Sequence, residues 1–174
     1  PASPRAAAPP AAKPADWPVI AAYGDSLSAG FGAPVGQSYP DFLQQELDAA
    51  GYRYRVVNAG ISGDTTSGGL SRLDSVLDLK PRIAILELGG NDGLRGLPLD
   101  ATRSNLEKMV TGLRNAKVKV VIAGMTLPPN YGPDYIHKFE SIYVDLAREY
   151  KLVRIPFLLE GVATNPDLMQ AAGP

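Results

Sequence analysis

The sequence of 174 residues contains no cysteine and only one histidine. Without cysteine the chain can form no disulfide bond, no thiol nucleophile and no cysteine-ligated metal site. A single imidazole, with no second imidazole or thiolate to join it, also argues against a zinc site. We therefore expect neither a metal ion nor another cofactor.

The sequence also lacks an excess of charge of one sign and any long hydrophobic run. Its 17 lysines and arginines nearly balance 18 aspartates and glutamates, which leaves a formal net charge of −1 at pH 7. The basic residues do not cluster, so a nucleic-acid partner is not expected. No apolar run approaches the roughly 20 residues that a helix needs to cross a bilayer, so stable membrane insertion is not expected either.

The first sixteen residues have no hydrophobic periodicity. Five of them are proline and seven are alanine, and such a composition buries too little apolar surface to offset its ordering entropy. We expect residues 1–16 to form a disordered tether and residues 17–174 to form one domain. The chain starts with Pro1 rather than Met, which suggests a removed export segment and a periplasmic or secreted bacterial protein.

Short apolar runs alternate with segments of helical period along the rest of the chain. The apolar runs predict strands over residues 19–23, 54–58, 82–88, 118–124 and 152–155. The periodic segments predict helices over residues 39–50, 66–79, 101–115 and 135–150. Strands joined by helices imply right-handed crossovers and a parallel sheet, so the predicted fold class is α/β, a three-layer α/β/α sandwich.

Polar segments follow the first three predicted strands, over residues 23–28, 58–64 and 88–93. Each segment alone is typical of an ordinary strand-to-helix turn. In an open parallel sheet, however, ligands bind beyond the carboxyl ends of the strands. Three such segments in succession therefore indicate one shared site on that rim of the sheet.

The same segments carry a resemblance to a known family. Gly24-Asp25-Ser26-Leu27, then Gly60, then Gly89-Gly90-Asn91-Asp92 resemble the first three signature blocks of the SGNH, or GDSL, hydrolases. The stretches 56–65, 87–96 and 127–132 are similar to the bacterial branch of periplasmic thioesterases, arylesterases and lysophospholipases, and the similarity extends from about residue 19 to residue 170.

The resemblance implies both a fold and an activity. It implies a flavodoxin-like sheet of five parallel strands in the order 2-1-3-4-5. It also implies that a small acyl ester or thioester is hydrolysed through an acyl-Ser26 intermediate. The donors for the oxyanion would be the Ser26 N–H, the Gly60 N–H and the Asn91 side-chain amide. Glycine leaves the backbone open to substrate, and the asparagine amide donates without carrying charge.

The acidic residues beside these segments have structural roles in our interpretation. Asp25 braces the Ser26 turn, Asp64 caps the second predicted helix, and Asp92 suits a turn. Glu87 lies in a central strand and needs a partner if it is buried. Arg95 is one candidate for that partner.

The base that would activate Ser26 is absent from this sequence. In the resembled family the base belongs to a late Asp-x-x-His block, which is followed by a last helix. Here Ala172 stands where the acidic residue is expected, and no histidine follows it. The catalytic Asp and His are therefore not present in this chain, and the last helix is expected to be missing. We expect His137, the single histidine, to be exposed on the fourth predicted helix rather than to serve as a substitute base.

Two functions stay open at this point. The first is a serine ester hydrolase with impaired turnover, because loss of a triad member leaves only about 10³–10⁴-fold acceleration over water. The second is a catalytically dead module that binds an acyl ligand. A nucleotide binder has only fold analogy behind it. A missing last helix would also uncover apolar sheet surface, which favours self-association.

Overall fold

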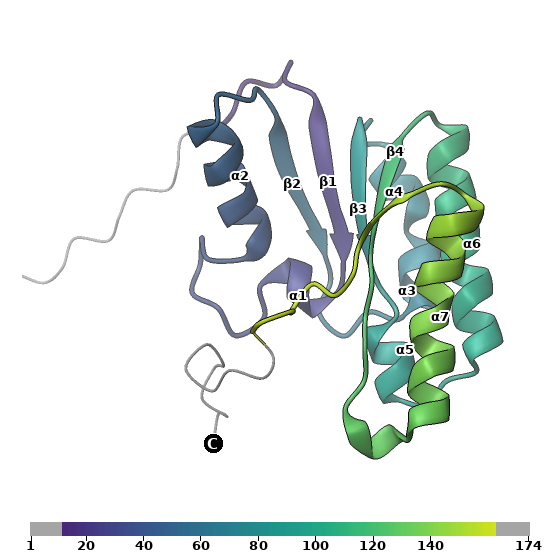
Figure 1. The fold of residues 1–174 in the computed structure, drawn as a ribbon. Helices are drawn as coiled ribbons and strands as arrows, with labels where there is room; N and C mark the ends of the chain where they lie inside the picture. The colour runs from purple at the N-terminus through teal and green to yellow at the C-terminus, as the bar shows by residue number, and fades with distance from the viewer. Residues whose placement is uncertain (1–11, 163–174) are drawn as a thin grey trace, which may run out of the picture.

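A computed structural model describes residues 12–162. It contains a five-stranded sheet in the order β2-β1-β3-β4-β5, with every neighbouring pair parallel (Figure 1). The strands are β1 (Val19–Gly24), β2 (Arg55–Gly60), β3 (Ile83–Glu87), β4 (Lys119–Ala123) and β5 (Val153–Ile155). The predicted α/β class and the predicted strand order are both confirmed.

Three long helices match their predicted ranges closely. They are α2 (Tyr39–Ala49), α6 (Leu99–Asn115) and α7 (Pro133–Glu149). The start of α2 is fixed by a capping box, in which the Ser38 hydroxyl accepts from the Asp41 N–H and the Asp41 carboxylate accepts from the Ser38 N–H at 2.9 Å. Each of these helices is long enough for its hydrophobic periodicity to be recognised in the sequence.

The predicted helix over residues 66–79 is wrong in one respect, because the structure divides it. It forms α3 (Thr66–Ser71) and α4 (Leu73–Leu77), with Arg72 between them at φ −109° and ψ 15°. Two consecutive glycines, Gly68 and Gly69, weaken helix propensity just before the break. The Arg72 side chain is also held by groups at the end of the sheet, which are described below.

Three short helical turns were not predicted. They are α1 (Ser26–Ala29), α5 (Gly90–Leu94) and the 3₁₀ turn η1 (Pro129–Tyr131). Each follows a strand, and each has at most five residues, which is too short to show a hydrophobic period. These turns form the rim at the carboxyl ends of β1, β3 and β4.

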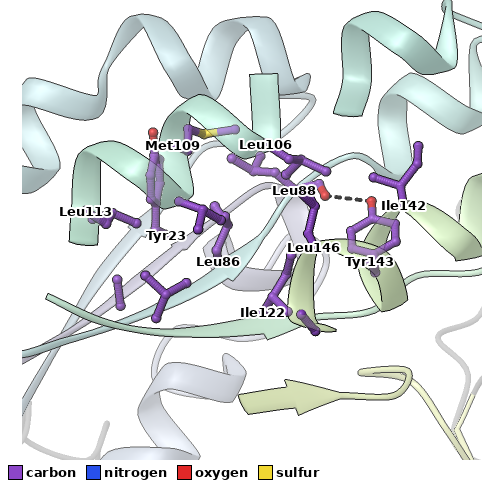
Figure 2. Close-up of a cluster of buried hydrophobic side chains, with 14 of the residues drawn as sticks. Tyr23, Leu86, Leu88, Leu106, Met109, Leu113, Ile122, Ile142, Tyr143 and Leu146 are labelled. Carbon is purple, nitrogen blue, oxygen red and sulfur yellow. Dashed lines mark hydrogen bonds between the residues drawn. The ribbon is translucent and has the colours of Figure 1, made fainter. Parts of the chain in front are cut away.

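The main core lies between the sheet and helices α3, α4, α6 and α7 (Figure 1). Side chains from strands and helices meet there without exposed surface, among them Tyr23, Leu86, Leu106, Met109 and Leu146 (Figure 2). The buried hydroxyls in this core have acceptors: the Tyr143 hydroxyl donates to the Leu88 carbonyl at 2.8 Å, and the Tyr23 hydroxyl donates to the Gly69 carbonyl. Both bonds tie the core to segments that lead into the rim.

Helix α2 lies on the opposite side of the sheet from α3–α7 (Figure 1). Its Gln44 side chain pairs with the outer edge of β2: Oε1 accepts from the Val56 N–H at 2.8 Å, and Nε2 donates to the Tyr54 carbonyl at 2.9 Å. Within residues 12–162, α2 is the one long helix on this side. Ile83 and Val121 remain half-buried there, so the described residues leave part of the second face uncovered.

Candidate active site

Ser26 is the first residue of α1 and directly follows the turn that leaves β1. Asp25 is the N-cap of this helix, and its Oδ1 accepts from the Leu27 N–H at 3.1 Å. The helix ends at Gly30, which has a left-handed φ of 81°. The prediction that Asp25 braces the Ser26 turn is confirmed. The half-buried Ser26 is therefore held at the rim by a cap on one side and a glycine stop on the other.

The turn at Ser26 is packed too tightly for a side chain at Gly24. A Cβ at that position would lie 2.0 Å from Ser28 Oγ and 2.7 Å from Glu87 Oε1. Strand β1 therefore needs glycine at its last residue so that α1 can fold back over the end of β3.

Gly60 ends β2 and is aligned with Gly24 of β1. A Cβ at Gly60 would lie 2.3 Å from the Ala29 backbone nitrogen, so this strand end packs directly against α1. The Gly60 N–H donates to Asn58 Oδ1 at 2.9 Å, and Asn58 Nδ2 donates to the Ser28 carbonyl at 2.7 Å. Sequence reasoning missed this role of Asn58, because the residue looked like an ordinary member of the turn.

Asn91 is the second residue of α5, after Gly89, whose φ of 111° lies in the left-handed region. Its Nδ2 donates to the Asp64 carbonyl at 2.9 Å and to Asp25 Oδ2 at 3.3 Å. The second contact joins Asn91 to the residue next to Ser26. The three predicted polar segments therefore meet on one rim.

A fourth block of the sequence, between α3 and α4, also holds the rim together. Arg72 donates to Asp64 Oδ2 at 2.7 Å, to the Ala59 carbonyl at 2.7 Å and to the Gly24 carbonyl at 2.8 Å. Its guanidinium lies 5.0 Å from the centre of the Tyr23 ring. Arg72 has no local sequence signal for this role, since only the fold brings these acceptors to it.

The predicted capping role of Asp64 is wrong. Thr65 is the N-cap of α3, and its hydroxyl accepts from the Gly68 N–H at 3.3 Å. Asp64 instead forms the ion pair with Arg72, in which both side chains are mostly buried. The neighbouring threonine takes the cap, which leaves the carboxylate free to pair with the guanidinium.

Asp92 does more than occupy a turn. It is buried within α5 and accepts from the Thr66 N–H at 2.8 Å, the Thr66 hydroxyl at 2.6 Å and the Thr102 hydroxyl at 3.1 Å. These bonds connect α5 to the starts of α3 and α6. Asp92 therefore positions the helix that carries Asn91.

Arg95 is not the partner of Glu87, contrary to the candidate pairing. Arg95 is exposed and donates to the Gly63 carbonyl at 3.0 Å. Glu87 is fully buried, and its Oε1 accepts from the Ser28 N–H at 3.1 Å and the Ser28 hydroxyl at 2.9 Å. Burial raises the pKa of Glu87 well above its usual range, and burial likewise raises the pKa of its neighbour Asp25.

The loop after β4 borders the same rim, as its place after a strand predicts. The Tyr131 hydroxyl donates to the Leu94 carbonyl at 2.7 Å, and the Tyr135 hydroxyl donates to the Gly93 carbonyl at 3.3 Å. Both acceptors belong to α5, the helix of Asn91. The loop over residues 127–132 is therefore fastened to the helix that supplies a predicted oxyanion donor.

His137 is exposed on α7, as predicted. It borders a hollow of about 270 Å³ between α6 and α7, together with Leu99, Arg103 and Asp145. No residue of the three polar segments lines this hollow.

Across residues 12–162, no group of three His, Cys, Asp or Glu side chains could hold a metal ion, and no helix is long and apolar enough to cross a membrane. The late block around Ala172 lies outside the described residues.

A family model described as the GDSL-like lipase/acylhydrolase family matches residues 22–173. The chain belongs to this family. By family, it is a hydrolase of ester bonds, and the Gly24-Asp25-Ser26-Leu27 turn is the sequence from which the family takes its name.

Related proteins support this GDSL assignment at high identity. The chain is 47% identical to esterase TesA of Pseudomonas aeruginosa over 151 residues, which covers 86% of this chain and 75% of that protein. It is 38% identical to thioesterase 1/protease 1/lysophospholipase L1 of Escherichia coli, again over 151 residues, covering 86% of this chain and 71% of that protein.

Solved structures of GDSL enzymes have the same fold. AlinE4, an SGNH-hydrolase family esterase, superposes with a TM-score of 0.87 at 46% identity, covering 91% of this chain and 86% of that one. The crystal structure of TesA superposes with a TM-score of 0.85 at 45% identity, covering 88% of this chain and 86% of that one.

Proposed function

We propose that this GDSL hydrolase acts through Ser26, whose hydroxyl oxygen attacks the carbonyl carbon of an ester or thioester. The alcohol or thiol leaves as the acyl-Ser26 bond forms, and water then releases the acid. The observation that carries the proposal is the contact between Asn91 Nδ2 and Asp25 Oδ2 at 3.3 Å, which brings an uncharged donor next to the serine turn.

The oxyanion would be bound by the Ser26 N–H, the Gly60 N–H and the Asn91 amide. The first N–H groups of a helix have no acceptor within that helix, so the Ser26 N–H is available to a ligand. Asn91 Nδ2 is held by the Asp64 carbonyl at 2.9 Å, and its second hydrogen, on the longer contact to Asp25 Oδ2 at 3.3 Å, would turn to the oxyanion. The Gly60 N–H donates to Asn58 Oδ1 at 2.9 Å and would exchange this acceptor for the oxyanion. The fold positions the donors before substrate arrives, so only these two hydrogen bonds have to change acceptor when the negative charge develops.

The substrate class would be small acyl esters or thioesters. Three exposed apolar side chains project from the segments that surround Ser26: Phe31, Ile61 and Leu94 are 76%, 50% and 49% exposed. They come from the segment after α1, the segment after β2, and α5. Apolar side chains at these positions suit the hydrocarbon part of an acyl chain. The related proteins are named as an esterase, an arylesterase and a thioesterase 1/protease 1/lysophospholipase L1, which is in keeping with this class.

Turnover by the 174-residue chain would be slow. Serine needs a base to take its proton, and this base is most often histidine. The single histidine of the sequence, His137, is exposed on α7 beside the hollow formed with α6. The spacing Asp-x-x-His occurs once in these residues, at Asp134 and His137, and both side chains are exposed on α7. We propose that hydrolysis depends instead on an Asp-x-x-His segment late in the chain, which residues 167–174 do not contain.

The second candidate function is a module that binds an acyl ligand without turning it over. The observation that favours it is that His137, the single histidine of these residues, is exposed on α7 and borders a hollow that none of the three polar segments lines. It predicts that the 174-residue chain binds a fatty acid and that no catalysed hydrolysis accompanies binding.

Hydrolysis of a short p-nitrophenyl ester distinguishes these functions. We expect slow release of p-nitrophenol by the 174-residue chain, faster release by a version with a restored Asp-x-x-His tail, and loss of that gain in the Ser26→Ala variant. His137→Ala is the matched control and should behave like the parent. Unchanged activity of Ser26→Ala with the tail would exclude Ser26 as the nucleophile, and a loss in His137→Ala would assign that histidine a catalytic role.

We also propose a periplasmic or secreted location. The support is the similarity to the periplasmic branch and the proline- and alanine-rich composition of residues 1–16. Fractionation of the bacterium that produces the protein, followed by immunoblotting, tests this proposal. Recovery in the cytoplasmic fraction would contradict it.

A further inference from the structure

Two buried carboxyl groups lie directly beneath the Ser26 turn. Glu87 is the last residue of β3 and is 0% exposed. Asp25 lies between β1 and α1 and is 3% exposed. The strands align Gly24, the residue before Asp25, with Glu87, and each carboxyl group lies close enough to the other to perturb its pKa. The mechanism proposed above assigns no proton transfer to either group.

The hydrogen bonds indicate where a proton resides. Glu87 Oε1 accepts twice from Ser28, but Oε2 is buried and receives no N–H or O–H donor from the described part of the chain. An ionised carboxylate with a bare buried oxygen is costly, whereas a protonated oxygen can donate to Asp25. Asp25 accepts from the Leu27 N–H at 3.1 Å and from Asn91 Nδ2 at 3.3 Å, which suits its ionised form.

We propose that Glu87 and Asp25 hold one proton between them, and that Glu87 in its acid form is a positioning residue for the Ser26 turn and the Asn91 amide. The inference rests on the proposed roles of Ser26 and Asn91. Glu87 holds the Ser26 turn through its hydrogen bonds with Ser28. Through Asp25, the acceptor of the Asn91 amide, it also orients Asn91.

The surroundings oppose ionisation of both carboxyls together. The ionisable groups that face the pair come from every neighbouring element: Asp64 after β2, Asp92 in α5, Tyr39 in α2, Tyr143 in α7 and Arg72 between α3 and α4. Arg72, the one cation among these groups, is already paired with Asp64. A second negative charge on the pair would have no cation of its own, so one proton stays bound at neutral pH.

The shared proton has a consequence for stability that can be measured. The pKa of Glu87 is raised above its usual value of 4.5, so the folded protein holds a proton that the unfolded chain releases. This contribution to stability is complete below pH 4.5 and is lost as the pH rises towards the pKa of folded Glu87. Over that interval one extra bound proton makes the unfolding constant rise about tenfold per pH unit.

Carboxyl ¹³C NMR of the 174-residue chain tests the shared proton without any substrate. We expect one glutamate resonance to show a protonated carboxyl at pH 7, and this resonance to be missing in Glu87→Gln. Glu107→Gln, which alters a glutamate bonded to Tyr150 on the far side of α6, is the matched control and should keep it. If every glutamate carboxyl is ionised at pH 7, the proposal is wrong.

A pair of substitutions tests positioning. Glu87→Gln keeps a donor towards Asp25 and an acceptor towards Ser28, so the NMR signal of the Asn91 side-chain amide should stay in place. Because glutamine does not titrate, the tenfold rise of the unfolding constant per pH unit should disappear. Glu87→Leu removes both contacts, so the Asn91 signal should shift and its amide hydrogens should exchange faster. An unmoved Asn91 signal in Glu87→Leu would reject the positioning role. Because neither readout involves hydrolysis, a failure of the Ser26 assignment would be seen separately in the ester assay.

Discussion

At the scale of single residues, the rim depends on side chains that each serve several backbone segments. Arg72 contacts the ends of β1 and β2 and the Asp64 carboxylate at once. Asn91 likewise connects α5 to Asp25 beside Ser26 and to the Asp64 carbonyl in the segment after β2. One change at either position therefore affects several segments together.

Replacement of Arg72 by Met should lower the free energy of unfolding by about 2–4 kcal/mol. The change removes three hydrogen bonds and leaves the mostly buried Asp64 without its cation. Urea denaturation followed by circular dichroism measures the loss. Arg114→Met is the control, because this exposed arginine also donates to a carbonyl and lies over a tyrosine ring, and it should cost under about 1 kcal/mol. Equal losses would contradict the linking role of Arg72.

Replacement of Asn91 by Ala should slow ester hydrolysis about a hundredfold in a version with the restored tail. A lost oxyanion donor raises the barrier by about 3 kcal/mol and acts on kcat more than on KM. Asn105→Ala, which removes a donor to the Thr66 hydroxyl at 3.1 Å, serves as the comparison and should retain activity. A rise in KM with an unchanged kcat would instead indicate that Asn91 only binds the ground state.

At the scale of elements, strand ends and very short helices form the site together. Strand β1 can be followed by α1 only because Gly24 leaves room for Ser28 and Glu87. Strand β2 approaches the same helix through Gly60. The position of the serine is therefore decided by backbone contact between elements as well as by its own turn.

Replacement of Gly24 by Ala should both destabilise the protein and reduce hydrolysis. The new methyl group would overlap Ser28 Oγ and Glu87 Oε1, and such overpacking costs about 1–3 kcal/mol while displacing the turn. Thermal unfolding and the ester assay with the restored tail measure the two effects. Gly36→Ala also costs stability, since its φ is +83°, but nothing lies within 4 Å of the added atom. It should leave hydrolysis unchanged, and a matched loss there would count against the packing argument.

The long elements could be predicted from the sequence, and the short ones could not. Helices α2, α6 and α7 have enough residues for a hydrophobic period to appear, and the apolar strand runs fix the sheet. Helices α1 and α5 are too short for that signal. The motif still locates Ser26, Gly60 and Asn91, because their spacing along the chain survives as a resemblance. The partners of Glu87 and Arg72 are distant in the sequence, in α1 for Glu87 and at the ends of β1 and β2 for Arg72, so no local pattern reveals them.

At the scale of the whole molecule, the two sides of the sheet differ. The side with α3, α4, α6 and α7 is closed by a continuous core, whereas the other side carries α2 alone among the long helices of residues 12–162 (Figure 1). Ile83, Ile85 and Val121 share that second side through the β3–β4 register, and two of them are half-buried. Apolar surface of this kind favours contact between copies.

The 174-residue chain should therefore self-associate in a concentration-dependent way. Ile83→Lys and Val121→Lys should shift sedimentation towards the monomer, because each puts a charge on the partly uncovered face. Val144→Lys changes an apolar residue that is 40% exposed on α7 and should not alter sedimentation. A monomer at all concentrations would contradict this prediction.

The β2 edge of the sheet is partly closed to contact between copies. Gln44 occupies hydrogen-bonding positions on the outside of β2, where an additional strand would otherwise attach. A single side-chain amide thus imitates a neighbouring backbone and leaves fewer free groups for a fibril to grow upon. The opposite edge strand, β5, has only three residues, which offers an incoming strand little to pair with. The two edges of the sheet therefore offer an incoming strand few free groups, whereas residues 12–162 leave part of the second face uncovered.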